Sequence, residues 1–396
     1  RGGYSVALIE AREPVTFDAS QGVGLRVSAI SPGAQSILEH AGAWRIVTQR
    51  RHCAYRRMHV EEDDVTADGS ERAAPAFDAL EFAAAEFGME RLGTIVENDS
   101  IAAALWQVLE ARKTAGDPLE IYCPARLDGI DPGADRVDVT LGSGEAISAR
   151  LVVGADGPRS PVRELAGIEQ KVWTYGQQGI VAVARAEKNN PGVAWQRFMP
   201  GGPLAFLPLD DGSSSIVWTR PNREAERLLG LEDDAFCAEL EVASGRWLGA
   251  VESAGPRAAF DLTMRLSDRY AGRRTVLVGD AAHVVHPLAG QGVNMGFLDA
   301  AALVELLGAV RSETGDLGSE SVVESVLERY QRWRRSDAEV MARGIHGIRA
   351  LFAPAALAPL RRLGLKLVGQ SWSAREAFLR RAAGLHADAP ALARLL

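Results

Sequence analysis

The sequence predicts an α/β fold, with a Rossmann-like sheet, an inserted antiparallel sheet and helices at the carboxyl end. Short apolar runs, such as residues 151–153 and 275–278, lead into glycine and aspartate, as parallel strands do before a helix. Residues 173–265 begin with short strand-like runs, which predict an antiparallel sheet. A long charged helix is expected over residues 321–346.

The composition of the 396 residues narrows the class of protein. With 47% hydrophobic and 24% charged residues, the chain has the composition of a globular protein, and its length suggests two or three domains. No uninterrupted apolar run reaches the ~18 residues that suggest a membrane span. The three cysteines lie far apart, which favours a reducing cytosol over a disulfide framework or a zinc site. A net charge of −8 without a basic aromatic surface argues against a nucleic-acid partner.

The first expected element is a buried parallel strand over residues 5–9, which ends at Glu10. In dinucleotide-binding units, an acidic residue lies about 20 residues after the first glycines of the GxGxxG turn and binds a ribose. Counting back about 20 residues from Glu10 passes the first residue of the chain. Either the preceding strand and its glycine turn are missing from this sequence, or Glu10 is an ordinary acidic residue at a strand end.

The next elements have recognisable local signals. Ser31 precedes a proline and begins a helix that ends at Gly42. Residues 95–98 end a strand, and residues 101–109 form an amphipathic helix. A hairpin is expected between residues 137–141 and residues 146–154.

Residues 153–163 place Asp156 and two glycines after an apolar strand, and Ser160 then begins a helix with proline at its first position. Such turns at the carboxyl ends of parallel strands are where α/β sheets bind ligands. Helix capping alone would also account for the pattern.

Residues 276–295 contain the most informative pattern in the chain. A buried strand ends at Gly279, Asp280 follows it, and a glycine-rich turn from Pro287 opens a helix at Gly292. The helix start offers free amides and partial positive charge to an anionic ligand. The alternative is a glycine-rich connection with a capping aspartate. His283 and His286 lack a third ligand, so no metal site is predicted.

Several segments occur in the order seen in one enzyme family. They are Glu10 in Ala-Leu-Ile-Glu-Ala-Arg, Arg26, Glu97-Asn98, Asp156 in Gly-Ala-Asp-Gly, and Gly279-Asp280. The chain thereby resembles class A flavoprotein monooxygenases of the para-hydroxybenzoate hydroxylase fold. Three segments are closer to the ubiquinone-biosynthesis hydroxylases of the 2-polyprenylphenol hydroxylase type: residues 92–98, 195–209 and 278–292. The family's amino-terminal strand and GxGxxG turn are not in this sequence.

The resemblance implies an FAD-dependent hydroxylase that uses NAD(P)H and O₂ to hydroxylate a phenolic ring, with a polyprenylated quinone precursor as the expected substrate. It assigns Glu10 to the adenosine ribose, Arg26 and Asn98 to the phosphate and ribityl region of FAD, and Asp280 to the ribityl or pyrophosphate side. It assigns the backbone amides of Gly292, Val293 and Asn294 to the flavin edge, and places Pro287 close to the reacting ring. Asp156 and Arg163 are expected to contribute to cofactor or NAD(P)H handling.

The resemblance also implies a division into domains. We expect the FAD-binding domain to comprise residues 1–60, 92–168 and 269–350, and the substrate-binding domain to comprise residues 61–91 and 169–268. Basic amphipathic helices are expected over residues 351–396. Four aromatic residues are candidates for the substrate wall, although aromatic residues at strand spacing are more often part of the core: Trp195, Phe198, Phe206 and Trp218.

Residues 341–396 carry nine Lys or Arg and two acidic residues, although the whole chain is acidic. Such a segment predicts peripheral contact with the inner face of an anionic membrane, where a prenylated substrate resides. Docking onto the acidic body of the protein is the alternative. Two other functions stay open: hydroxylation of a soluble aromatic compound, and a non-catalytic accessory role in a quinone-synthesis complex.

Overall fold

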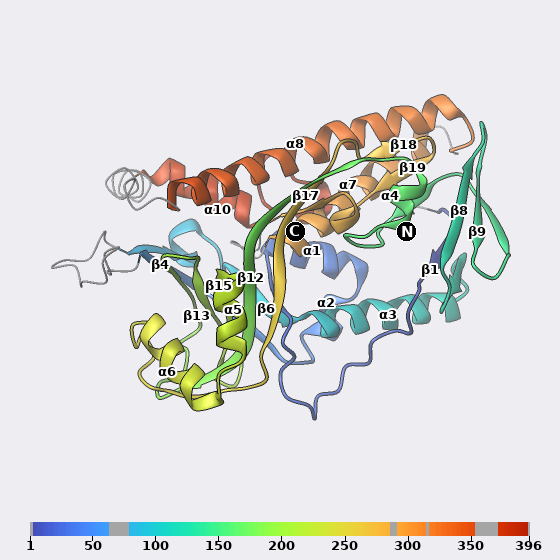
Figure 1. Ribbon diagram of the computed structural model, residues 1–396. Coiled ribbons are helices and arrows are strands. Elements are labelled where there is room, and N and C mark those ends of the chain that lie inside the picture. The colour runs from blue at the N-terminus through green and yellow to red at the C-terminus, as the bar shows by residue number, and fades with distance from the viewer. Residues whose placement is uncertain (1–2, 63–78, 286–290, 314–316, 353–370, 395–396) are drawn as a thin grey trace.

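The computed structural model describes residues 3–62, 79–285, 291–313, 317–352 and 371–394. The long helix α8 (Glu320–Phe352) runs along one side of the molecule (Figure 1). Below it, the extended strands β12 (Gln170–Ala186) and β17 (Ala258–Ser267) reach into a lobe that carries α5 (Asn222–Leu229) and α6 (Asp233–Ala243). Short parallel strands and α3 lie in the other lobe.

Two pairs of short strands have the parallel arrangement that the sequence predicts. Strand β1 (Val6–Ile9) pairs with β7 (Leu119–Tyr122), and β11 (Val152–Gly154) pairs with β19 (Thr275–Leu277). Strand β19 also pairs with β18 (Ala271–Gly272) in antiparallel orientation. The parallel direction predicted for the first strand is therefore confirmed.

The predicted burial of this first strand is wrong. Val6 on β1 is 52% exposed, and Val153 on β11 is 42% exposed. Within the described residues, β7 is the single strand paired with β1, and β11 likewise has one paired neighbour, β19. A strand with one unpaired edge keeps part of its apolar surface in solvent.

A third, antiparallel sheet joins β2 (Val27–Ile30), β6 (Gly93–Glu97) and β3 (His52–Tyr55). The capped helix predicted after β2 is confirmed as α1 (Pro32–Ala41), in which the Ser31 hydroxyl accepts a hydrogen bond from the Ala34 amide. Gly42 ends this helix at φ 85°, a conformation that favours glycine. The short helix α2 (Trp44–Val47) and the long helix α3 (Asn98–Thr114) complete this layer.

The hairpin predicted for residues 137–154 is only partly correct. Strand β9 (Val137–Leu141) does pair with β10 (Ala146–Ala149), and β8 (Leu127–Pro132) lies on its other side. Strand β11, however, leaves this sheet and pairs with β19. A bend at Arg150 separates β10 from β11, so one continuous stretch supplies strands to two sheets.

The largest sheet contains the predicted antiparallel strands. Along the sheet the order is β20, β17, β12, β15, β14, β13, β4, β5, with β16 beside β12. The bounds of the strands not yet given are β4 (Arg57–Glu62), β5 (Leu80–Ala83), β13 (Val193–Phe198), β14 (Leu204–Pro208), β15 (Ser214–Pro221), β16 (Val251–Ala254) and β20 (His283–Val284). Strands β4 and β13 pair in parallel, an exception that the sequence did not indicate.

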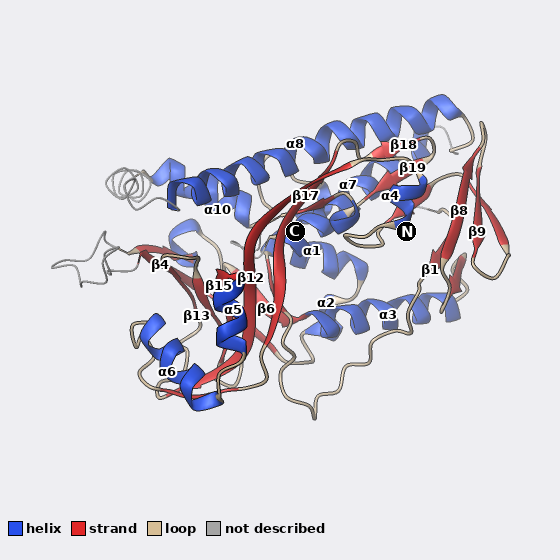
Figure 2. Cartoon of the chain, viewed as in Figure 1, coloured by secondary structure: helices blue, strands red, loops and turns tan. Residues whose placement is uncertain are grey.

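Three of the aromatic residues considered for the substrate wall belong instead to the core of this lobe. Trp195, Phe206 and Trp218 are at most 2% exposed. They pack in one cluster with residues of α5 and α6, including Phe236 and Leu240. The interpretation of these residues as a substrate wall is therefore wrong, because two helices cover their face of the sheet (Figure 2).

The remaining helices pack around the parallel strands. Helix α7 (Gly292–Glu313) is long and apolar enough to cross a membrane, with a window of mean hydropathy 1.6, but half of that window is buried. It contacts α1 and α8 and contributes to the main core, so it is a core helix. Helices α4 (Pro161–Leu165) and α10 (Trp372–Ala382) are shorter. Of the segment predicted to form basic helices, residues 353–370 and 395–396 lie outside the described residues.

Candidate active site

The turn after β19 presents Asp280 at the surface of the molecule. Val276 and Leu277 are fully buried, and Gly279 turns the chain at φ 58° into a 3₁₀ turn, η2 (Gly279–Ala281). Asp280 itself is exposed. Partial desolvation by the surrounding protein raises the pKa of its carboxyl group, while the charges of His283 and Arg26 act in the opposite direction. Arg26 therefore lies within electrostatic reach of Asp280.

Asn98 lies beside Arg26. The Asn98 amide donates a hydrogen bond to the Arg26 carbonyl, 3.0 Å away, at the point where β6 leads into α3. The Ser28 hydroxyl donates to the Asn98 side-chain oxygen at 2.6 Å. Antiparallel pairing of β2 and β6 thus brings together two residues that are 72 positions apart in the sequence. Arg26 lies near both Asn98 and Asp280, so the three residues form one group.

The start of α7 adjoins this group. An added Cβ at Gly279 would lie 3.5 Å from the Gly296 Cα, so the turn packs directly on the first turns of α7. A backbone bond joins the Met295 amide to the Gln291 carbonyl, and the amides of Gly292 and Val293 lie at the start of the helix. Of the atoms in the described ranges, none would lie within 4 Å of a Cβ added at Gly292.

The Asn294 side chain holds the start of α7 in place. Its oxygen accepts a hydrogen bond from the Ser31 amide, and its nitrogen donates to the Ala29 carbonyl, both at 2.9 Å. The side chain is buried and connects α7 to the end of β2. The sequence analysis considered only the backbone amide of Asn294, so this role of the side chain was missed.

Glu10 and Asp156 lie apart from this group. The Glu10 carboxylate accepts a hydrogen bond from the Arg12 amide at 2.9 Å. Asp156 is exposed and accepts from the Val162 amide at 2.9 Å, which caps α4. Within the described residues, no hydrogen bond or ion pair joins either carboxylate to Asp280. Buried Arg163 donates to the Pro158 carbonyl at 3.2 Å, and so helps to hold the same turn.

Pro287, which belongs to the predicted site, lies outside the described residues, as does His286. His283 is described and almost fully buried, and its Nε2 lies 2.6 Å from the Asp299 carboxylate. Over the described ranges, no group of three metal-ligating side chains is present.

The sequence analysis also missed the ion pair between Arg51 and Glu97. Their closest atoms are 3.0 Å apart. Glu97 also accepts from the Gly24 amide at 2.7 Å, while Arg51 donates to the carbonyls of Ala19 and Gln21. These bonds hold the loop that leads to Arg26. Arg51 has no sequence signal of its own, because the partners named here are 30 to 46 residues away.

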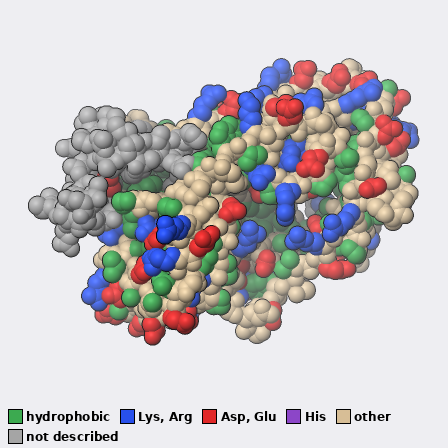
Figure 3. Space-filling model, in the orientation of Figure 1, with side chains coloured by type: hydrophobic (Ala, Val, Ile, Leu, Met, Phe, Trp, Pro, Cys, Tyr) green, Lys and Arg blue, Asp and Glu red, His purple; other side chains and the backbone are tan. Residues whose placement is uncertain are grey.

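The surface is hollowed near the centre of the view in Figure 3, between the two lobes. Apolar side chains form the floor of this hollow, and Lys and Arg side chains gather along its border. A hollow of this kind favours a ligand with an apolar ring and anionic groups.

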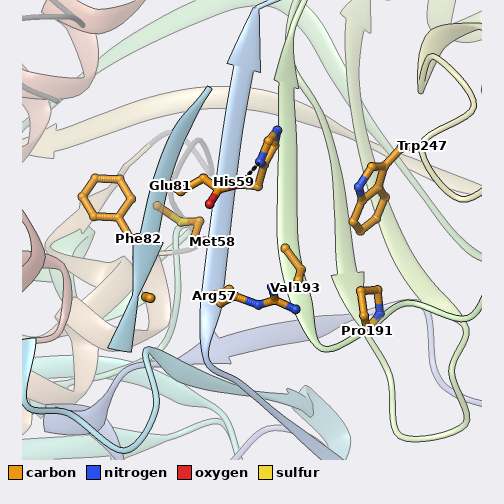
Figure 4. A pocket seen from close by; sticks show the side chains of 9 residues that line it. Arg57, Met58, His59, Glu81, Phe82, Pro191, Val193 and Trp247 are labelled. Carbon is orange, nitrogen blue, oxygen red and sulfur yellow. Dashed lines mark hydrogen bonds and ion pairs between the residues drawn. The ribbon is translucent and has the colours of Figure 1, made fainter. Parts of the chain in front are cut away.

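A separate pocket of about 200 Å³ lies on β4, β5 and β13 (Figure 4). His59 occupies its wall and is held between the carboxylates of Glu61 and Glu81, at 2.9 and 3.1 Å. Trp247 and Pro191 form the opposite side. None of the predicted site residues lines this pocket, so it is distinct from the site around Asp280.

Comparisons with known proteins show the family of the chain. Residues 107–344 match a family described as an FAD binding domain. The chain is 37% identical over 389 residues to the 3-demethoxyubiquinol 3-hydroxylase of Escherichia coli, covering 97% of this chain and 93% of the relative. It is 36% identical to the ubiquinone hydroxylase UbiL of Rhodospirillum rubrum, covering 96% and 84%.

Solved structures show the same fold. The p-nitrophenol 4-monooxygenase PnpA of Pseudomonas putida superposes with a TM-score of 0.70 over 97% of this chain and 93% of that chain, at 16% identity. The chain thus has the α/β fold of class A flavin monooxygenase structures. The chain belongs to the FAD-binding monooxygenase family and is an FAD-dependent hydroxylase, as the sequence predicts.

Proposed function

We propose that the protein hydroxylates the ring of a ubiquinone precursor, using FAD, O₂ and NAD(P)H. The observation that carries this proposal is the 37% identity with the 3-demethoxyubiquinol 3-hydroxylase, which extends over nearly the whole of both chains. Similarity at this level over both domains includes the elements around Asp280 as well as the nine-stranded sheet. We place the substrate between these two parts.

The described residues fit the cofactor. Arg26 is an exposed cation for the phosphates, and Asp280 and Asn98 offer oxygen and nitrogen atoms to the hydroxyl groups of the ribityl chain. Gly292 leaves open space at the start of α7, where a side chain would block a flat ring. When bound, FAD supplies the electron transfer from NAD(P)H and the activation of O₂.

The chain itself contributes orientation and charge. The amides of Gly292, Val293 and Asn294 lie at the positive end of the α7 dipole, where negative charge on the flavin edge is stabilised. Arg26 lowers the cost of keeping the Asp280 carboxylate ionised beside an anionic cofactor. We further assign Glu10 to the adenosine ribose, Asp156 and Arg163 to cofactor or NAD(P)H handling, and Pro287 to the reacting ring.

Two measurements test this function. Purified protein incubated with FAD should be yellow, with absorbance near 450 nm. With NADH or NADPH and O₂, it should add one oxygen atom to a prenylated demethoxyubiquinol, detected by mass spectrometry. A protein that stays colourless after addition of FAD would contradict catalysis by this chain. Turnover of small phenols without turnover of the prenylated compound would instead identify a hydroxylase of soluble aromatics.

We also propose peripheral contact with the inner face of a membrane through residues 341–396, from the cytosolic side and within a quinone-synthesis complex. Helix α10 exposes Trp372 and Phe378, which are 50% and 45% accessible. Aromatic residues next to basic ones favour the interface of an anionic bilayer. The double variant Trp372→Ala/Phe378→Ala should co-sediment less with anionic vesicles than the unaltered protein, and equal co-sedimentation would contradict this contact.

A further inference from the structure

A cluster of buried charges lies directly behind the Gly279–Asp280 turn. Asp299, on the second turn of α7, is completely buried. Its carboxylate accepts hydrogen bonds from the Gly279 amide at 2.9 Å and from Arg334 Nε at 2.6 Å, and it lies 2.6 Å from His283 Nε2. His283 and Arg334 are each 1% exposed. One carboxylate thus connects the turn, β20 and the long helix α8.

The Asp299 carboxylate is kept ionised in this buried position. Burial alone would raise its pKa, but the charges of His283 and Arg334, together with their hydrogen bonds, hold the pKa below its ordinary value. Buried ion pairs are often no more stabilising than apolar residues of similar volume. A gain in stability therefore does not explain why charged residues occupy this place. Their position behind the Gly279–Asp280 turn points instead to a role in arranging that turn.

The geometry of the turn depends on this carboxylate. The chain leaves β19 through Gly279, whose positive φ turns Asp280 toward the surface. The bond from the Gly279 amide to Asp299 fixes the Val278–Gly279 peptide, one residue before Asp280. The Ser267 hydroxyl also donates to the Ala281 carbonyl of this turn at 3.5 Å, but Asp299 is the anchor next to Asp280. Without Asp299, the Gly279 amide would lose its side-chain acceptor.

The same cluster extends toward the carboxyl end of the chain. Arg334 also donates to Asp337 at 2.7 Å, and Asp337 in turn accepts from Arg381 at 2.6 Å and lies 3.2 Å from His386. Arg381 ends α10, and His386 follows it. Asp299 and Asp337 thereby bind the Arg334 guanidinium together, and the bond to Asp337 keeps it oriented toward Asp299.

We propose that Asp299 is a positioning residue for the cofactor site: held by Arg334, it fixes the Gly279 peptide so that Asp280 faces FAD. This role rests on the proposed contact between Asp280 and the cofactor. Asp299 acts through the turn and does not itself touch the ligand.

The test uses the double variant Asp299→Leu/Arg334→Met, which removes the buried carboxylate together with the guanidinium that pairs with it. A second double variant, Asp299→Asn/Arg334→Met, keeps an oxygen that can accept from the Gly279 amide. The control is Glu305→Ala, which removes an acceptor on the same helix that binds only the Ala391 amide, far from the turn in sequence. Urea unfolding and circular dichroism establish that each variant is folded.

Two readouts are compared, hydrogen exchange of residues 278–284 and FAD affinity from flavin fluorescence. The leucine variant should exchange faster in this segment and bind FAD at least tenfold more weakly, and the asparagine variant should recover much of the affinity. The control should match the unaltered protein in both readouts. Unchanged exchange or unchanged affinity in the leucine variant would overturn the proposal, as would an asparagine variant equal to the leucine variant.

The variant Asp280→Asn, measured in parallel, separates this proposal from the one on which it rests. If Asp280→Asn binds FAD as tightly as the unaltered protein, the contact between Asp280 and the cofactor is wrong, and the positioning role is wrong with it. If Asp280→Asn weakens binding but the leucine variant does not, the positioning role alone is wrong.

Discussion

Two strand-to-helix turns in one sheet have similar sequences but different surroundings. Gly154 and Asp156 follow β11, whereas Gly279 and Asp280 follow β19, and the two strands pair in parallel with Gly154 opposite Leu277. Asp156 is exposed and caps the short helix α4. Asp280 is also exposed, but the turn that carries it is bound from behind by buried Asp299.

The difference shows that the sequence of a turn does not reveal how strongly the surrounding protein stabilises it. The turn at Asp156 is stabilised by contacts within eight residues, as in an ordinary capped helix. The turn at Asp280 depends on Asp299 and Arg334, which lie 20 and 55 positions after Gly279. We therefore expect substitutions behind the second turn to have much larger effects than substitutions in the first.

The largest effect is expected from Asp299→Asn. This variant removes one of the two carboxylates that pair with the buried Arg334 guanidinium and leaves Asp337 as the other, and breaking such a buried pair destabilises proteins by about 3–5 kcal/mol. Urea unfolding measures the change. Glu239→Gln, which weakens the exposed ion pair with Arg227, is the matched control and should cost at most about 1 kcal/mol. Equal losses of unfolding free energy in Asp299→Asn and Glu239→Gln would show that the buried cluster stabilises the protein no more than an exposed ion pair does.

Lowering the pH should remove the stabilisation that the ionised Asp299 carboxylate contributes. The pKa of Asp299 is lowered in the folded protein, so its contribution is present above the unfolded pKa of about 3.9 and is lost as the pH falls through the lower, folded value. The free energy of unfolding should therefore fall less steeply below about pH 4 in Asp299→Asn than in the unaltered protein. Urea unfolding at a series of pH values from 7 to 3 checks this. Parallel pH profiles would contradict an ionised Asp299.

A smaller effect is expected from Asp280→Asn on cofactor binding. Loss of a charged hydrogen-bonding partner costs about 1.5–3 kcal/mol, which corresponds to roughly 10- to 100-fold weaker FAD binding. Fluorescence titration measures it. Because burial raises the pKa of Asp280, the neutral variant should be at least as stable as the unaltered protein without FAD. Loss of stability together with affinity would indicate a structural role for this carboxylate.

The smallest effect is expected from Asp156→Ala. The variant removes the acceptor of the Val162 amide, which should cost about 1 kcal/mol of unfolding free energy, as for other helix caps. Ser160→Ala, which removes the other cap of the same helix, serves for comparison. A destabilisation as large as that of Asp299→Asn would mean that the two turns do not differ in their support.

The sequence could predict features that depend on neighbouring residues. The cap at Ser31, the glycine at residue 42 and the proline between them specify α1, because each satisfies or ends the backbone hydrogen bonds of one helix. The apolar run before Gly279 likewise predicts β19 and the turn that presents Asp280. The motifs around these turns are also enough to indicate the FAD-dependent monooxygenase family.

The tertiary structure alone decided which surfaces are covered and which charges meet. Trp195 and Trp218 have the spacing of strand residues, but only the packing of α5 and α6 makes them core rather than substrate wall. Residues 146–154 are continuous in sequence, yet they supply two different sheets. Asp299 and Arg334 lie on different helices, so no local pattern links them. Local patterns record backbone preferences, whereas burial and ion pairing arise from segments that meet only when the chain folds.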